Sequence, residues 1–133
     1  MCLFCQIVEN KISAYKIYED EECMAFLDIF PRAFGHTLVI PKKHYEKYSD
    51  MTEEDASKLG KAIHKVANQI INKLNVPAYN IFNNNGKISG QEIMHVHFHI
   101  LPRSVNDGVN FLLPPVMQEA KDKLEEIHNS IIK

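Results

Sequence analysis

Three histidines at alternate positions, His95, His97 and His99, form the part of this sequence best suited to chemistry. Successive side chains of a β-strand point to opposite faces, so the three imidazoles share one face and the apolar residues between them share the other. At a rise of about 3.3 Å per residue, neighbouring histidines lie ~6.6 Å apart and the outer pair ~13 Å apart. One tetrahedral metal is therefore within reach of two neighbouring imidazoles, but hardly of all three on a straight strand.

Such a row of imidazoles can supply a nucleophile and proton-handling groups together, because the unperturbed pKa of imidazole lies near neutrality. A neutral imidazole nitrogen can attack phosphorus and form a covalent intermediate, which divides one difficult displacement into two easier ones. The alternative is a polar sheet face whose histidines are only solvated or hydrogen-bonded. Three histidines on one face favour chemistry, and the predicted substrate is a phosphate ester, anhydride or amidate.

The segment directly before these histidines is polar and punctuated by glycine, with Asn84, Gly86, Gly90 and Gln91. Backbone N–H groups in such a loop can cradle an anion. Asn/Gly clusters also mark plain turns. The position immediately before three histidines favours phosphate binding over a plain turn.

Cys2 and Cys5 form a C-x-x-C motif, which is compatible with a redox pair, half of a zinc site or coincidence. A redox pair usually follows a strand, whereas only one residue precedes this motif. Zinc needs two further ligands, and the chain offers His44 and His95. Such a site would attach the N-terminus to the sheet and withdraw His95 from catalysis. Cys23, in a predicted strand, is expected to be a small buried core residue.

The elements that must position these residues follow from hydrophobic patterning. Short apolar stretches bounded by acidic residues, Gly or Pro predict strands at 15–18, 23–27, 36–40, 79–82 and 95–101. Between the second and third of these lies a loop at 28–35 whose large apolar residues are expected to plug a core edge or line a pocket.

From Thr52 the apolar residues follow a helical period. Thr52 with Asp55 can cap the start of this helix, and residues 75–77 end it. A second amphipathic helix is expected after Pro115. Strands precede and follow the long helix without regular alternation, so the predicted class is α+β with a mostly antiparallel sheet. The helical stripe consists of Leu59, Ile63, Val66, Ile70 and Leu74.

Length and composition describe an ordinary small domain. The 133 residues suit one domain, and 45% hydrophobic with 24% charged residues fits neither a disordered chain nor a membrane protein. A formal charge of -2 lacks the basic excess that long nucleic acids require of a partner. We expect no transmembrane segment and no secretory signal, and three cysteines then favour a reducing compartment, the cytoplasm.

Taken together, these motifs resemble the histidine triad family of nucleotide hydrolases and transferases. The row of three histidines followed by two apolar residues is similar to the family signature, and the resemblance continues, in the expected order, over 2–7, 25–29, 36–44 and 90–103. One domain at 1–133 would then consist of a matched core at 2–103 and a helical tail at 104–133. The resemblance implies a five-stranded antiparallel sheet with a long helix, and homodimers whose sheets join into one of ten strands.

The resemblance also implies roles for individual residues. His97 would attack the α-phosphate of a purine nucleotide, His99 would contact the phosphate, and His36 would support the histidine row. Asp28 matches the carboxylate that takes the ribose hydroxyls. A structural zinc site made of Cys2, Cys5, His44 and His95 is similar to that of bacterial members. The implied nucleotide-binding residues are Phe4, Ile7, Phe26, Asp28, Ile29, Asn84, Gln91, Glu92 and Ile93.

Two departures from the family pattern bear on the substrate. Glu92 stands where several relatives have Ser or Thr, and the tail lacks the Trp-bearing end of the phosphoramidase branch. The ending at 101–103 is similar to the branch that hydrolyses dinucleoside polyphosphates. The leading hypothesis is cleavage of nucleoside phosphoramidates, such as adenosine phosphoramidate, through a nucleotidyl-histidine. The alternatives are dinucleoside polyphosphate hydrolysis, a nucleotide-binding regulatory module, and a hydrolase with a catalytic metal on the histidine row.

Overall fold

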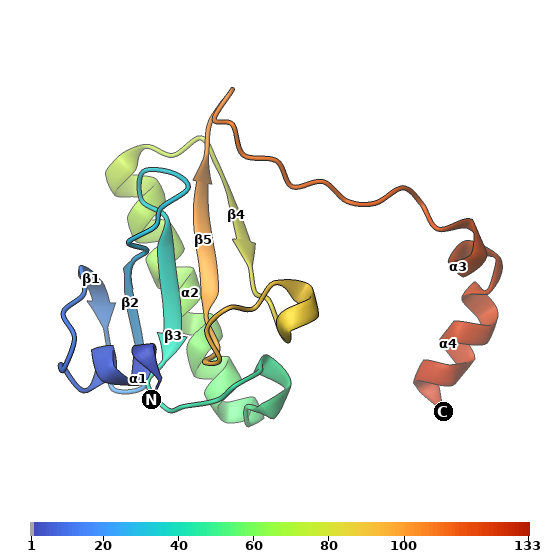
Figure 1. The fold of residues 1–133 in the computed structure, drawn as a ribbon, viewed down its shortest axis with the longest axis horizontal. Coiled ribbons are helices and arrows are strands. Elements are labelled where there is room, and N and C mark those ends of the chain that lie inside the picture. The colour runs from blue at the N-terminus through green and yellow to red at the C-terminus, as the bar shows by residue number, and fades with distance from the viewer. Residues whose placement is uncertain (1) are drawn as a thin grey trace.

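The computed structural model describes residues 2–133, whose strands form one five-stranded antiparallel sheet in the order β1-β2-β3-β5-β4 (Figure 1). This arrangement confirms the predicted class. The elements are α1 (Leu3–Val8), β1 (Lys16–Glu19), β2 (Cys23–Leu27), β3 (Thr37–Pro41), η1 (Tyr48–Asp50), α2 (Glu53–Leu74), β4 (Ala78–Phe82), η2 (Lys87–Ser89), β5 (Phe98–Arg103), α3 (Gln118–Asp122) and α4 (Leu124–Ile132).

The long helix α2 covers one face of the sheet, and its limits agree with the sequence prediction. The Thr52 side chain accepts the N–H of Asp55 at the start, and Asn75 ends the helix in the left-handed conformation with φ of 51°. The apolar stripe packs against inward-facing residues of β2, β3 and β5. Leu74 is the exception, because it lies in the last turn and is 52% exposed. The buried residues of α2 are Leu59, Ala62, Val66, Ala67 and Ile70.

The opposite face of the sheet carries α1, a helix that the sequence patterning did not predict. Phe4 and Ile7 of α1 are buried against Phe26 and Leu38 of the sheet. A helix of six residues is too short to show a clear period, and its N-cap is a cysteine rather than Ser, Thr, Asp or Asn. This second, smaller core leaves room for a cavity beside it.

The histidine segment is only partly a strand, which corrects the predicted strand at 95–101. β5 begins at Phe98 because the preceding backbone is held elsewhere: the N–H of Val96 donates to the oxygen of Tyr45 at 2.8 Å. The predicted alternation nevertheless holds. Val96 is buried in the core beneath α2, whereas the rings of His95 and His97 contact Phe4 on the other face.

The C-terminal tail forms two short helices rather than the single predicted one. They meet at Lys123, and the chain from β5 reaches them through an extended segment that carries α3 and α4 away from the sheet (Figure 1). Apolar side chains of α4, such as Leu124 and Ile131, remain exposed. Within residues 2–133, every helix falls short of the length and apolar character needed to cross a membrane.

Candidate active site and metal centre

A cavity of about 360 Å³ opens on the α1 side of the sheet and collects most of the predicted site residues. Its walls come from α1 and the segment after it, from the end of β2 with the loop that leads to β3, and from β3. The end of β4 with the loop after it, and β5 with the segment before it, complete the walls. Of the predicted catalytic and nucleotide-binding residues, Gln91 is the one that the walls do not include. The predicted residues that line the cavity are Phe4, Ile7, Phe26, Asp28, Ile29, His36, Asn84, Glu92, Ile93, His97 and His99.

His97 is held in the tautomer that a nucleophile requires. Its Nδ1 atom lies 2.7 Å from the main-chain oxygen of His95. A carbonyl oxygen can only accept, so Nδ1 carries the hydrogen and the Nε2 atom of the neutral ring keeps a lone pair. Burial lowers the pKa of His97, which keeps the ring neutral near pH 7. His97 therefore presents an unprotonated nitrogen.

A chain of hydrogen bonds determines the opposite tautomer for His99. The main-chain N–H of Arg32 donates to the Nδ1 atom of His36 at 3.1 Å, so the neutral His36 ring carries its hydrogen on Nε2. That Nε2–H lies 3.0 Å from the Nδ1 atom of His99 and donates to it. The Nε2 atom of His99 must then carry a hydrogen. The neighbouring rings of His97 and His99 thus offer a lone pair and a donor to the same cavity.

Burial keeps the other site histidines neutral as well. Desolvation lowers the pKa of His36, and it lowers the pKa values of His95 and His99 to about 4. Asp28 opposes this effect for His36, because its Oδ2 atom lies 3.6 Å from the Nε2 atom of that ring. These imidazoles are therefore neutral near pH 7.

The amides of both glycines in the loop after β4 are engaged within the loop and are therefore not free to cradle an anion as predicted. The amides of Gly86, Ser89, Gly90 and Gln91 donate within the loop. The Gln91 side chain is 3% exposed, accepts the N–H of Gly86 at 2.7 Å, and donates to the oxygen of Glu46 at 2.7 Å. Gln91 thus stabilises the conformation of the loop and does not face the cavity.

Asn84 lines the cavity, as do Glu92 and Ile93 further along the same loop. It packs against Gly90, where an added Cβ atom would lie 3.4 Å from the Nδ2 atom of Asn84. Gly90 also has a φ of 106°, which side chains other than glycine rarely adopt. A glycine at this position therefore leaves room for the Asn84 amide beside the histidines.

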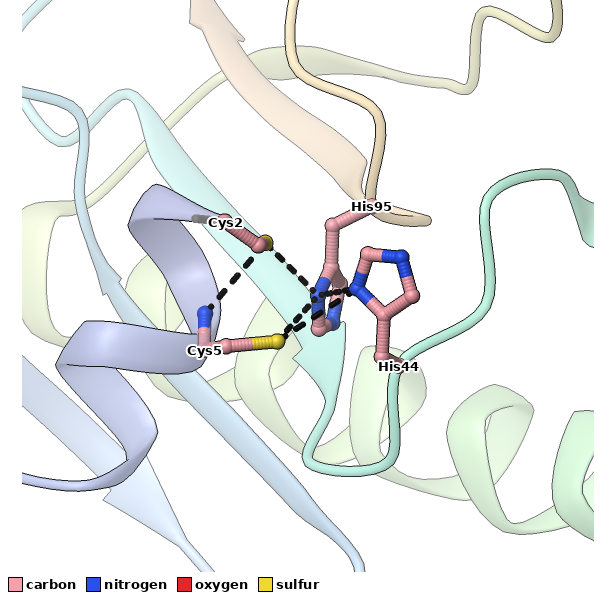
Figure 2. Close-up of side chains that lie close together, drawn as sticks. All are labelled: Cys2, Cys5, His44 and His95. Atoms are coloured by element: carbon pink, nitrogen blue, oxygen red, sulfur yellow. Dashed lines mark hydrogen bonds between the residues drawn. The ribbon is translucent and has the colours of Figure 1, made fainter.

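The four predicted metal ligands come together beside the cavity (Figure 2). The Sγ atom of Cys2 lies 3.4 Å from the Nδ1 atom of His95, and the Sγ atom of Cys5 lies 3.4 Å from the Nδ1 atom of His44. The two Nδ1 atoms are 3.2 Å apart. Tetrahedral zinc with bonds of about 2.0–2.3 Å would place its ligands at similar separations.

The protonation of this group also fits a metal. The Nε2 atom of His95 lies 2.8 Å from the main-chain oxygen of Pro41, so Nε2 carries the hydrogen and Nδ1 keeps its lone pair. Burial, with the hydrogen bond to Cys2, raises the pKa of the Cys5 thiol to about 11. A bound cation would favour the thiolate and reverse that effect. The donors therefore suit zinc.

A second group of possible ligands, Asp28, His36 and His99, lies inside the cavity. A metal there would need a lone pair on the Nε2 atom of His36. Because the Arg32 N–H donates to the Nδ1 atom of His36, the ring hydrogen lies on Nε2 instead. This geometry favours a hydrogen-bonding role for His36 over a catalytic metal on the histidine row.

The cavity wall also contains residues that were not identified as site residues from the sequence, among them Arg32 and Phe82. The ring of Phe82 stacks on His99 with centroids 4.3 Å apart and an interplanar angle of 6°. Their contact depends on the pairing of β4 with β5, in which Phe82 lies opposite His99. No local sequence pattern predicts the register between β4 and β5.

Known proteins of similar sequence belong to one family. The HIT domain family matches residues 9–106. An uncharacterized HIT-like protein of Methanocaldococcus jannaschii is 50% identical over 81% of this chain and 83% of its own length. Adenosine 5'-monophosphoramidase of Saccharomyces cerevisiae is 36% identical over 98% of this chain and 80% of its own length.

Solved structures share the fold. The crystal structure of a HIT family protein from Bacillus subtilis has a TM-score of 0.92 and 39% identity, covering 98% of this chain and 94% of that one. A Zn-bound histidine triad family protein from Mycobacterium smegmatis has a TM-score of 0.77 and 33% identity, covering 97% of this chain and 96% of that one. The chain belongs to the HIT domain family, a family of nucleotide-binding hydrolases.

Proposed function

We propose that the protein cleaves nucleoside 5'-phosphate conjugates at the α-phosphate through a nucleotidyl-histidine on His97. The observation that carries this proposal is the paired tautomers of His97 and His99. The Nε2 lone pair of His97 attacks phosphorus and forms a P–N bond while the bond to the leaving group breaks. The leaving amine departs with a proton taken from solvent. Water then attacks the same phosphorus and gives up a proton to solvent, and the P–N bond breaks to return neutral His97. The Nε2–H of His99 stabilises the charge on the phosphoryl oxygens in both steps.

The cavity walls support a nucleotide as the bound group. Apolar side chains of α1 and the β2 end offer a slot for a purine base, and Asp28 is placed to accept hydrogen bonds from ribose hydroxyls. Asn84 lines the same cavity as the histidines, and its side-chain amide supplies a hydrogen bond for the phosphate. Glu92 and Ile93 line the cavity. The apolar slot consists of Phe4, Ile7, Phe26 and Ile29.

Charge favours a phosphoramidate over a dinucleoside polyphosphate. Among the described residues that line the cavity, the carboxylates of Asp28 and Glu92 face a single guanidinium, that of Arg32. The histidines stay neutral and add no positive charge. A phosphoramidate brings fewer negative charges than a polyphosphate chain, so its binding costs less in such a site. The name of the Saccharomyces cerevisiae relative, adenosine 5'-monophosphoramidase, points to the same substrate class.

The ending at 101–103, which resembles the branch that hydrolyses dinucleoside polyphosphates, does not support that activity here. Arg103 directs its guanidinium to Asp107, with Nε 2.7 Å from Oδ2, and to Asn80 at 2.8 Å. It does not line the cavity. Arg103 is therefore not placed to neutralise further phosphates of a substrate.

The direct test is intact-mass measurement after brief incubation with adenosine phosphoramidate or a diadenosine polyphosphate. We expect a nucleotidyl adduct on the unaltered protein, none on His97→Ala, and faster turnover of the phosphoramidate. His64→Ala is the control, because His64 is exposed on α2 away from the cavity. Undiminished turnover by His97→Ala would refute the mechanism. Tight nucleotide binding without turnover would refute it in favour of the regulatory module.

We further propose a structural zinc ion at Cys2, Cys5, His44 and His95. The tetrahedral separations and the thiol chemistry support it, and so does the Zn-bound relative from Mycobacterium smegmatis. Bound there, zinc would hold α1 against the segment before β5. It supplies no step of the reaction.

A homodimer in the cytoplasm completes the proposal. The outer edge of β4 is unpaired within residues 2–133, and Tyr79 and Ile81 on this strand are each 44% exposed. An exposed apolar edge strand is a template for pairing with another chain. The three cysteines are unpaired in the structure, which agrees with a reducing compartment. The dimer is tested by measuring the mass in solution of the protein and of an Ile81→Lys variant.

A further inference from the structure

A column of stacked side chains connects the segment after β5 to the catalytic histidines. The ring of Phe82 lies flat on His99, and the ring of Phe111 meets Phe82 edge-on, with centroids 5.2 Å apart at 66°. The guanidinium of Arg103 lies 5.6 Å from the Phe111 centroid. The column therefore runs from Arg103 through two phenylalanines to His99.

The base of this column is held by several hydrogen bonds. Asp107 accepts from Nε and Nη2 of Arg103 at 2.7 and 3.2 Å, and it also accepts the main-chain N–H groups of Ser104 and Val109. The Nη2 atom of Arg103 also donates to the oxygen of Val109 at 3.0 Å. Residues 103–109 thus form a braced loop, and Phe111 follows directly from it.

His99 needs such support because its hydrogen bond to His36 fixes only one point of the ring. Rotation of the ring about its Cβ–Cγ bond is restrained by whatever packs on its faces. The nearly parallel face of Phe82 supplies that restraint. Misdirection of a catalytic group by about 1 Å can cost on the order of 100-fold in rate.

We propose that Phe82, backed by Phe111 and Arg103, is a positioning residue that orients the imidazole of His99 toward the substrate phosphate. This inference rests on the proposed function for its catalytic consequence. It makes the segment at 103–111 part of the catalytic apparatus, although none of its residues lines the cavity. Phe82 does line the cavity, so Phe111 offers the cleaner test of positioning.

The kinetic test uses the full chain with adenosine phosphoramidate. We expect Phe82→Leu to lower kcat by roughly 10-fold or more, and Phe111→Leu to lower kcat by a smaller factor with KM unchanged. Phe82→Tyr keeps the ring face and should retain most of kcat. Phe98→Leu is the matched control, because Phe98 lies on β5 but contacts Tyr48 on the opposite face.

A measurement that does not need turnover separates this proposal from the proposed function. A stacked aromatic ring shifts the ring-proton NMR signals of His99 upfield. We expect that shift to disappear in Phe82→Leu, to shrink in Phe111→Leu, and to persist in Phe98→Leu. If the unaltered protein cleaves no conjugate, the proposed function fails, and the NMR shifts still decide whether the column orients His99.

Two outcomes would contradict the proposal that the column orients His99. One is an unchanged His99 signal in both Phe82→Leu and Phe111→Leu. The other is a loss of kcat that follows the loss of melting temperature equally in Phe82→Leu, Phe111→Leu and Phe98→Leu. That pattern would show that the rings act only through general packing.

Discussion

The Nδ1 atom of His97 lies 2.7 Å from the main-chain oxygen of His95, so one hydrogen bond joins the proposed nucleophile to a proposed metal ligand. The side chain of His95 is fully buried and also bonds to Pro41. The His95 carbonyl group, which determines the tautomer of His97, is thus held in place by the buried side chain of the same residue. A metal on His95 would stabilise this peptide without entering the reaction.

Replacing one metal ligand should release zinc and reduce stability. We expect Cys5→Ser to lose most bound zinc in elemental analysis and to lower the melting temperature by several degrees, because zinc binding is linked to folding. Cys23→Ala should retain zinc, since Cys23 is buried in the core away from the group. A Cys2→Ser or Cys5→Ser variant with full zinc content would contradict the ligand set. Instant loss of turnover with a chelator would contradict a structural role.

Stability should fall as the pH decreases below about 6.5, the pKa of an unfolded histidine. Burial lowers the pKa of His99 to about 4 in the folded protein, so between these values the unfolded chain binds a proton that the folded chain excludes. The pKa values of His36 and His97 are lowered in the same direction. Urea denaturation at pH 7.5, 6 and 5 checks this trend.

A His99→Gln variant should show a weaker decline over the same pH range, because one of the shifted groups is gone. An equal decline in both proteins would mean that His99 does not contribute. A free energy of unfolding that rises toward pH 5 would contradict the burial effect altogether.

Asp28→Asn should weaken recognition of ribose. We expect the KM for adenosine phosphoramidate to rise about 10-fold, the scale of a lost charged hydrogen bond, and the preference over the deoxyribose analogue to shrink. Asp20→Asn is the control, because Asp20 accepts main-chain N–H groups in the turn before β2, outside the cavity. Unchanged discrimination between the two sugars in Asp28→Asn would contradict the assignment.

Two glycine substitutions should change stability in opposite directions. Gly60 lies in α2 with open space around its Cα atom, so Gly60→Ala should stabilise the protein by about 0.5–1 kcal/mol. Gly35 has a φ of 88°, and an added Cβ atom would lie 2.6 Å from the Cδ1 atom of Leu74. Gly35→Ala should therefore destabilise by roughly 1 kcal/mol or more. Denaturant midpoints measure both, and equal signs would contradict the prediction.

Features that depend on neighbouring residues could be predicted from the sequence. The cap at Thr52 and, apart from Leu74, the apolar stripe of α2 were predicted correctly, because capping and helical periodicity act within a few residues. β2 was also predicted with its observed limits, Cys23–Leu27. The start of β5 was wrong, since the N–H of Val96 bonds to Tyr45, a partner far away along the chain.

The candidate site shows the same division. Residue types and spacing in the sequence determined a row of imidazoles facing one way, and a set of four donors suited to zinc. Only the tertiary structure decided the tautomers of His97 and His99, which depend on a main-chain oxygen and on the Arg32 amide. It also turned Gln91 away from the cavity and stacked Phe82 on His99. Such contacts depend on strand register and loop closure, whereas side-chain chemistry and alternation are properties of the local chain.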